Sequence, residues 1–332
     1  NTSGSSNVGV GLNVLDANTT GFSNTAVGAD ALGANTTGSH QTASGFEALR
    51  SVAVSSFNTA FGSQALKVAV ADSCVAVGAQ SLLSCTSGAG NTAVGRDSMG
   101  ATTTGSNNVA VGKTALYANT TASNNTAVGH SALFANTTGA ANTAIGISAG
   151  SAITTGGENI AIGKDAGLTG SPGGNITSSN RYVLIGDENI QQAHIQVDWT
   201  VASDARDKTD FTALDLGLDF VKALAPVTYK WDKRSKYGDK SAEDYDLNAQ
   251  TPDGTHKEDW LDIGFKAQEV EALEIAAGYT KDNNTNLVSS HTADGKQMGL
   301  QYSKFVPILV KAIQEQQALI EALTARIETL EG

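Results

Sequence analysis

Ser203 and Lys208 are the residues of this chain whose types and spacing could support catalysis. They lie five positions apart in the stretch SDARDKTDF, residues 203–211. A neutral lysine amine can take the proton of a serine hydroxyl, which then attacks a carbonyl carbon, if burial or a positive neighbour lowers the lysine pKa. Serine and lysine five apart also occur by chance in most proteins. Spacing alone therefore leaves a solvated charged turn as the simpler interpretation.

Two cysteines, Cys74 and Cys85, are too few for a disulfide framework. Both occupy asparagine positions of the repeat described below, an exchange familiar from leucine-rich repeats. We expect buried structural thiols, with a disulfide or a metal contact as the alternative.

His256 and His291 lie in two polar segments, 236–259 and 280–297, that have the composition of long hairpins or loop insertions. Histidines in such loops are solvated by default, and neither has a partner at metal-ligand spacing. We expect no metal site and no cofactor.

Charge divides the chain at residue 202. Residues 1–202 hold only 6 of the 21 Lys/Arg and 10 of the 33 Asp/Glu, and the formal net charge of the 332 residues is −12. Both parts are negative, which argues against nucleic acid or an anionic membrane surface as a partner. No apolar run reaches about 18 residues, so we expect no membrane insertion.

The first part is an internal repeat. A glycine that mostly closes the string AVG or AIG recurs every 17 residues, with one step of 16. It falls at positions 11, 28, 45, 62, 78, 95, 112, 129, 146 and 163. A 17-residue unit is too short for two helices and fits one coil of a parallel β-solenoid or β-roll. A flexible linker would show no fixed period.

Fixed positions within the unit indicate a thin core. Val or Ile precedes the glycine in eight units, and Leu or Met99 follows it by four in eight. Asparagine lies four before the glycine in eight units, where its amide can bond to turn backbone and to its stacked copies. Ala lies two before it in nine units. We expect this small residue to mark the place where chains meet in a trimer.

The repeats resemble the head repeats of trimeric bacterial adhesins and the shafts of phage tail fibres. The resemblance covers residues 7 to about 170 and specifies shape more than function. No aromatic residue recurs to form a sugar-stacking stripe, so a spacer is the simpler interpretation. A host cell-surface glycan or receptor remains a possible partner.

The second part resembles the intramolecular chaperone auto-processing domain of endosialidase tail spikes and many phage tail fibres. Four motifs carry the resemblance in order: SDARDKTDF, LDFVKALAPVTYKW, IGFKAQEVEAL and the closing LQYSKFVPILVKAIQEQQALIEALTARIETLE. The family implies a homotrimeric chaperone that assembles the β-structured fibre before it and then cuts itself off through a Ser/Lys dyad.

Carried onto this sequence, the dyad is Ser203 and Lys208 and the scissile bond is Ala202–Ser203. The implied enzyme is a single-turnover, self-cleaving serine endopeptidase and not a metabolic enzyme. Asp204 and Arg206 complete the motif, either as supporting residues or only through local hydrogen bonds.

The closing segment has a heptad pattern. Two interleaved series repeat every seven residues: Val306, Ile313, Ile320 and Ile327, and Leu309, Gln316, Leu323 and Leu330. This pattern predicts a coiled-coil helix and by itself favours two strands, so the trimer comes from the resemblance. The alternative is an amphipathic helix that packs on its own domain.

We therefore expect a mainly β part, 1–170, a linker with a short β segment, 171–202, and an α+β chaperone domain, 203–332, with a helix at about 303–331. Strand-like runs in the linker are RYVLIG and HIQVDWTVA. The leading function is a viral tail fibre, made in the host cytoplasm and placed in the virion, with a self-releasing chaperone. Alternatives are a trimeric adhesin head at a bacterial cell surface and the distal part of a glycan-degrading tail spike with its active site upstream.

Overall fold

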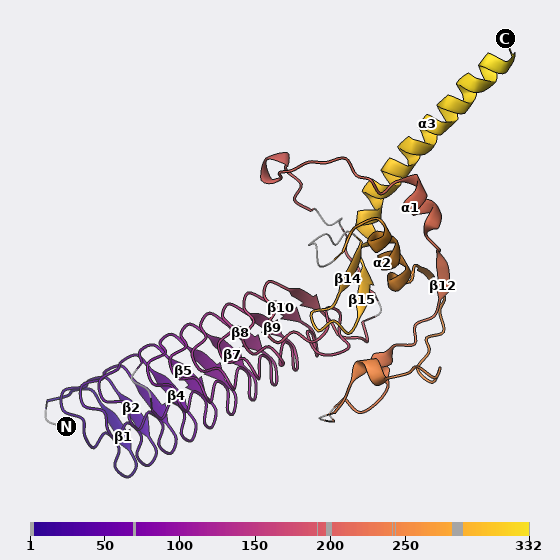
Figure 1. Cartoon of the computed structure of the whole chain (residues 1–332). Coiled ribbons are helices and arrows are strands. Elements are labelled where there is room, and N and C mark those ends of the chain that lie inside the picture. The colour runs from indigo at the N-terminus through magenta and orange to yellow at the C-terminus, as the bar shows by residue number, and fades with distance from the viewer. Residues whose placement is uncertain are drawn as a thin grey trace. The chain divides into compact units, whose positions relative to one another are not determined.

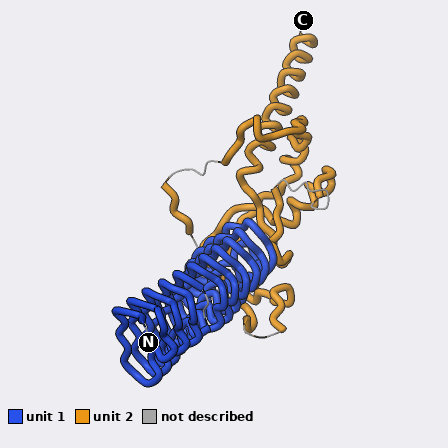
Figure 2. Tube along the Cα trace, turned by 90° about the vertical axis from the view of Figure 1, so that its left-hand side faces the viewer, with its two compact units in different colours: residues 1–190 blue, residues 191–332 orange. Residues whose placement is uncertain are grey.

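The computed structural model describes residues 3–68, 71–190, 192–196, 201–240, 242, 244–280 and 288–331. The chain forms two compact units, Asn1–Ile190 and Gln191–Gly332 (Figure 2). Unit 1 is a parallel β-solenoid, and unit 2 is a small mixed α/β region with a long C-terminal helix.

Unit 1 is a single parallel sheet of eleven three-residue strands in sequence order, one per coil (Figure 1). Each residue pairs with its equivalent in the next coil, as Ala26 does with Ala43. This confirms the predicted solenoid. The strands are β1 (Val8–Val10), β2 (Thr25–Val27), β3 (Thr42–Ser44), β4 (Thr59–Phe61), β5 (Val75–Val77), β6 (Thr92–Val94), β7 (Val109–Val111), β8 (Thr126–Val128), β9 (Thr143–Ile145), β10 (Ile160–Ile162) and β11 (Val183–Ile185).

The core of each coil is built from the recurring small and apolar residues. The middle residue of strands β2 to β11 is buried, and it is alanine in all but β11; the leucine six residues later, such as Leu116, is also fully buried. The alanine side chains point into their own coil with no exposed surface. Our expectation that chains meet at this alanine is therefore wrong. The residues that face outward are its two neighbours in each strand, mostly Thr, Val and Ile.

The turns need backbone conformations that L-residues avoid. The repeat glycine has φ between +106° and +139°, the residue two after it has φ near +55°, and the buried Leu or Met has φ near +50°. A Cβ on Gly112 would lie 2.4 Å from the carbonyl oxygen of Gly129 in the next coil. Left-handed backbone costs a non-glycine residue about 1–2 kcal/mol. Burial of a leucine, about 1.5–3 kcal/mol, offsets that cost.

A ladder of asparagines joins successive coils, as predicted. Asn125 Oδ1 accepts from the backbone N of Asn142 at 2.9 Å, and Asn108 Oδ1 accepts from that of Asn125 at 2.9 Å. The side chains also bond to each other, with Asn125 Nδ2 at 3.2 Å from Asn108 Oδ1. All three residues are fully buried.

The solenoid continues past the last 17-residue repeat. β11 pairs with β10 after an offset of 23 residues, Ile160 with Val183. The predicted strand in RYVLIG is thus confirmed as β11. The predicted strand over 194–202 is absent from residues 194–196 and 201–202, and its residues 197–200 lie outside the described part of the chain.

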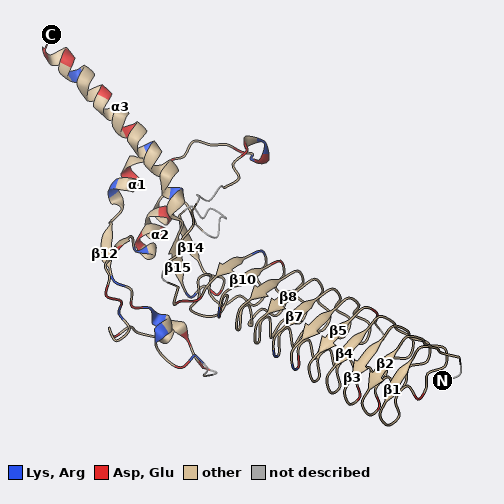
Figure 3. Ribbon diagram, turned by 180° about the vertical axis from the view of Figure 1, so that it is seen from behind, with Lys and Arg blue, Asp and Glu red and all other residues tan. Residues whose placement is uncertain are grey.

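Unit 2 alternates short helices with two β-ribbons. The helices are α1 (Leu218–Ala223), α2 (Ala267–Ala276) and α3 (Phe305–Glu331), with 3₁₀ turns η1 (Ala205–Asp207), η2 (Arg234–Lys236), η3 (Leu247–Ala249) and η5 (Tyr302–Lys304). The antiparallel ribbons are β12 (Val227–Tyr229) with β13 (Asp262–Gly264), and β14 (Ser289–His291) with β15 (Met298–Leu300). Charged residues are dense here and sparse in the solenoid (Figure 3).

One apolar cluster holds unit 2 together. It is formed by Leu216, Phe220, Val270, Val288, Phe305 and Ile308. These residues come from α1 and the segment just before it, α2, the entry to β14 and the first turns of α3, so the cluster fixes those elements around one centre. Glu274 of α2 is also buried and accepts from the backbone N of Val288 at 2.6 Å and of Ser289 at 3.1 Å, which anchors β14 to α2.

Candidate self-cleavage site

The 3₁₀ turn η1 brings Ser203 and Lys208 together. Its backbone bonds run from Asp207 N to Asp204 O at 3.2 Å and from Lys208 N to Ala205 O at 3.3 Å. The turn folds the chain back so that residues on either side of it face each other. Lys208 Nζ lies 2.6 Å from Ser203 Oγ and donates a hydrogen bond to it. The structure thus places the two residues in direct contact.

Asp204 and Arg206 bond to each other within this turn. Asp204 caps η1 by accepting from Arg206 N at 2.9 Å, and its carboxylate pairs with the Arg206 guanidinium at 2.6 Å. The Arg206 side chain, and then its backbone N–H, hold the pKa of Asp204 below its usual value. These contacts are local hydrogen bonds within the turn that brings Ser203 and Lys208 together.

The segment around the dyad is open to solvent in the single chain. Every residue from 201 to 213 is exposed, and Val201 and Phe211 keep 78% and 70% of their surface. The peptide bond between Ala202 and Ser203 is therefore accessible. A lysine can act as a general base when burial or a positive neighbour lowers its pKa.

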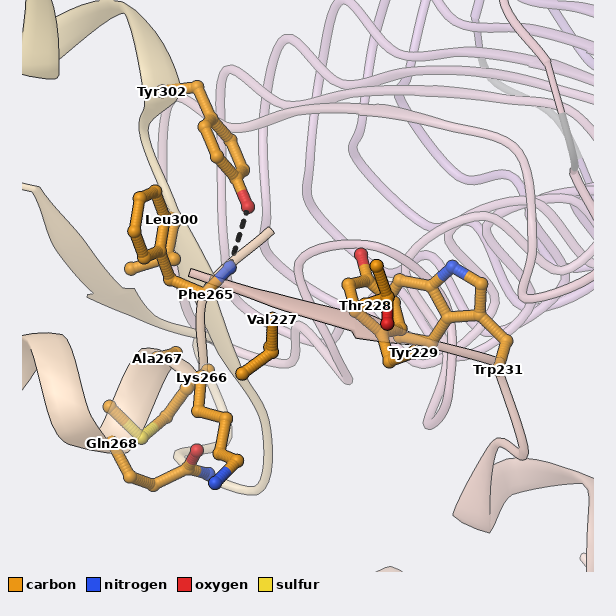
Figure 4. Close-up of a pocket in the computed structure, with 12 residues that line it drawn as sticks. Val227, Thr228, Tyr229, Trp231, Phe265, Lys266, Ala267, Gln268, Leu300 and Tyr302 are labelled. Carbon is orange, nitrogen blue, oxygen red and sulfur yellow. Dashed lines mark hydrogen bonds between the residues drawn. The ribbon is translucent and has the colours of Figure 1, made fainter. Parts of the chain in front are cut away.

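A separate aromatic cleft of about 460 Å³ lies between the two ribbons of unit 2 (Figure 4). Tyr229, Trp231, Phe265 and Tyr302 are among its lining residues, and the dyad is not. The Tyr302 hydroxyl accepts from the backbone N of Phe265 at 3.4 Å.

Asp262 of β13 anchors one wall of the cleft. It accepts from Trp231 Nε1 at 3.2 Å. Burial, and then the charge of Asp262, raise the pKa of Tyr229. We did not predict this cleft from the sequence. The only local signal is the aromatic pair in TYKW, residues 228–231.

The histidines and cysteines have structural partners. His291 lies in β14 with Nε2 at 2.6 Å from Glu271 Oε1, so the prediction of a solvated loop histidine is wrong there. His256 is exposed and stacks edge-on against Tyr237.

Cys74 and Cys85 are free and buried. Within the described residues, no three His, Cys, Asp or Glu side chains gather as a metal site would require. No described helix has the length and apolarity to cross a membrane.

Comparison with known proteins gives a family match for part of unit 2. Residues 203–279 match the family described as chaperone of endosialidase. No curated protein and no solved structure matches the chain. The match begins at Ser203, the first residue of the candidate dyad, and includes the cluster residues of α1 and α2. This match within unit 2, combined with the parallel β-solenoid of unit 1, fits a tail fibre with a chaperone domain.

Proposed function

We propose that the chain is a segment of a homotrimeric viral tail fibre whose C-terminal unit directs assembly of the solenoid and then releases itself. Release is by cleavage between Ala202 and Ser203. The observation that carries the proposal is the 2.6 Å contact of Lys208 Nζ with Ser203 Oγ at the first residue of the family match. A placement in the virion follows from the same family.

The proposed reaction begins with neutral Lys208 as general base. It takes the Ser203 hydroxyl proton while Oγ attacks the carbonyl carbon of Ala202, the residue directly before it. The C–N bond breaks, the α-amino group of Ser203 takes up the proton, and an ester joins Ala202 to Oγ. Water then hydrolyses the ester and leaves a carboxylate on Ala202 and a free serine at the new N-terminus. Because Ser203 departs with the released unit, each chain reacts once.

Helix α3 supports self-association. Phe305, Ile308 and Ala312 are buried in unit 2, but the helix continues to Glu331 and its predicted heptad residues are exposed. These include Val306, Leu309, Ile313, Ile320, Leu323, Ile327 and Leu330. The helix thus packs on its own domain only through its first turns. An apolar stripe of this length is stable in water when other helices cover it.

The outer face of the solenoid gives a second surface for association. Its strands present β-branched side chains outward, and Val27, Val111, Ile145 and Ile162 are all exposed. A face this apolar and regular suits burial against another chain. Assembly would also be the step that covers the exposed dyad, so we propose that trimerisation precedes cleavage.

The cleavage proposal is tested with the full chain on denaturing gels and by mass spectrometry. Wild type should yield fragments of 202 and 130 residues, because the 332-residue chain is cut after Ala202. Ser203→Ala and Lys208→Arg should remain whole, since arginine keeps the charge but cannot act as a base at neutral pH. Lys222→Arg, at an exposed lysine paired with Asp219, is the matched control and should cleave normally. Cleavage that persists in Ser203→Ala overturns the proposed nucleophile.

Assembly is tested separately in the uncleaved Ser203→Ala chain. Ile313→Asp places a charge in the exposed stripe of α3, whereas Gln314→Asp places the same charge beside it at another exposed position. Light scattering should give a three-chain mass for Gln314→Asp and a lower mass for Ile313→Asp. With Ser203 intact, Ile313→Asp should also slow cleavage. A trimer that forms and cleaves normally with Ile313→Asp removes α3 from the assembly.

A further inference from the structure

Cys74 and Cys85 occupy a pair of positions whose side chains meet at one carbonyl oxygen in other coils. Asn24 and Asn35 both donate to Gly38 O, at 2.9 and 3.0 Å. Asn108 and Asn119 both donate to Ala122 O, at 2.9 and 3.1 Å. The repeat geometry therefore directs these two side chains of a coil to the same point.

The cysteines keep this arrangement with sulfur in place of the amide. Cys74 Sγ and Cys85 Sγ each lie 3.3 Å from Gly88 O, so the two sulfurs are within twice that distance of each other. The two thiols are close enough that each shifts the pKa of the other. Both side chains are fully buried. The chain has only these two cysteines, and both lie in one coil.

Cysteine in place of asparagine at these two positions removes part of the asparagine ladder in this coil. The Cys74 backbone N still donates to Asn58 Oδ1 at 2.9 Å, but a thiol has no carbonyl oxygen to offer to the coil that follows. A thiol is also a weaker donor than an amide. The pair therefore replaces two amide donors with two weaker thiol donors in this coil.

We propose that Cys74 and Cys85 form a site of reversible oxidation that closes as a disulfide within this coil when a peroxide is present. Both thiols are buried, so the reaction requires local opening of this coil, and Cys85 is followed directly by the exposed Thr86 and Ser87. The Gly88 carbonyl stays satisfied after oxidation, because Asn91 Nδ2 also donates to it at 3.0 Å.

The two cysteines have different roles in the reaction. The neighbouring Cys85 thiol lowers the pKa of Cys74 to about 7, and the neighbouring Cys74, together with burial, raises the pKa of Cys85. Cys74 is then the first nucleophile: its thiolate attacks one peroxide oxygen and the O–O bond breaks. The products are a sulfenic acid and hydroxide, which takes up the proton that Cys74 lost and becomes water. Cys85 sulfur attacks the sulfenic sulfur and releases a second water. Two thiols and one peroxide thus give one disulfide and two waters.

The experiment treats the full folded chain with peroxide, denatures it in acid and labels free thiols with N-ethylmaleimide. Trypsin releases both cysteines in one peptide, residues 68–96, because no Lys or Arg lies between Lys67 and Arg96. We expect a peptide two hydrogens lighter with no label, and two labels when a reductant is added before labelling. Two labels without reductant, or sulfinic acid on either residue, would overturn the proposal.

A matched variant tests whether oxidation to a disulfide needs both cysteines. Cys85→Asn restores the residue found at this position in other coils, so it should fold, and peroxide should leave Cys74 as a sulfenic or higher acid with no disulfide. In wild type, closure should also slow amide exchange over residues 75–84 relative to the untreated chain. A disulfide between two chains in wild type, seen as a dimer on a non-reducing denaturing gel, would contradict the intra-coil geometry.

Discussion

Replacing Asn125 with alanine tests whether the buried ladder holds the coils together. Asn125 Oδ1 is the acceptor for Asn142 N at 2.9 Å, and Asn142 is fully buried. The substitution leaves that N–H without this acceptor and without access to water. The backbone bond on the other side of residue 125 is kept, because Asn108 Oδ1 still accepts from the backbone N of residue 125 at 2.9 Å.

The expected loss follows from this single orphaned donor. An unsatisfied buried N–H costs about 1–3 kcal/mol. In a stack where each coil contacts only its neighbours, the loss should concentrate in the coils around residue 125. Amide hydrogen exchange measured by mass spectrometry over residues 108–145 should therefore speed up roughly 5- to 150-fold, since 1.4 kcal/mol corresponds to tenfold. Exchange in the coils of β1 to β4 should stay unchanged.

Thr121→Ala is the matched control for Asn125→Ala. Thr121 is an exposed residue four positions earlier in the same coil-to-coil turn. Its truncation should change stability by less than about 0.5 kcal/mol, which is about twofold in exchange. Equal exchange in the two variants would refute the reasoning, because the buried side-chain bonds would then contribute no more than a surface methyl and hydroxyl.

Two further predictions concern the glycine column and the contact of α1 with α3. Gly112→Ala should lower the melting temperature of unit 1, because φ is +138° and a Cβ lies 2.4 Å from Gly129 O; the backbone conformation alone costs about 1–2 kcal/mol. Gly33→Ala, with no positive φ and 3.3 Å to the nearest atom, should have a much smaller effect, and equal effects would contradict the packing argument. The backbone N–H of Leu218 donates to the Glu315 carboxylate at 2.7 Å and lowers the pKa of that carboxyl group below its usual 4.5. The stability that this hydrogen bond contributes is fully present above about pH 4.5. It is lost as the pH falls through the lower pKa that Glu315 has in the folded protein. Thermal unfolding should show wild type losing its advantage over Glu315→Gln below pH 4.5; an advantage that does not change with pH would show that the charge has no role.

The solenoid could be predicted because each layer repeats the same side-chain types at the same positions. The period, the strand at AVG and the asparagine ladder all follow from that recurrence. The direction of the alanines could not be predicted, since a small residue signals close packing without saying whether the neighbour is its own coil or another chain. The left-handed conformation of residues such as Leu116 has no local signal either, because leucine does not favour it. β11 follows a 23-residue step that hides it from a search for a fixed period.

The candidate site was only partly visible in the sequence. Ser203 and Lys208 are close in sequence, so one short turn decides their contact, and the resemblance had already singled them out. The cleft and the His291–Glu271 pair bring together elements that are distant along the chain. Such contacts depend on how the ribbons pack on α2, which local patterns do not encode.

The sameness of the coils makes lateral alignment ambiguous. Two solenoids displaced by one coil would present almost the same ladder of outward side chains, so the regular coils alone give several nearly equal alignments. Two irregularities would remove this degeneracy in an assembly of solenoids: the 16-residue step between Gly62 and Gly78, and the 23-residue step before β11. The 23-residue step is the larger departure from the 17-residue period, and it is the one nearest in sequence to unit 2. Additional regular coils would lengthen the solenoid but would not help to fix its alignment with another chain.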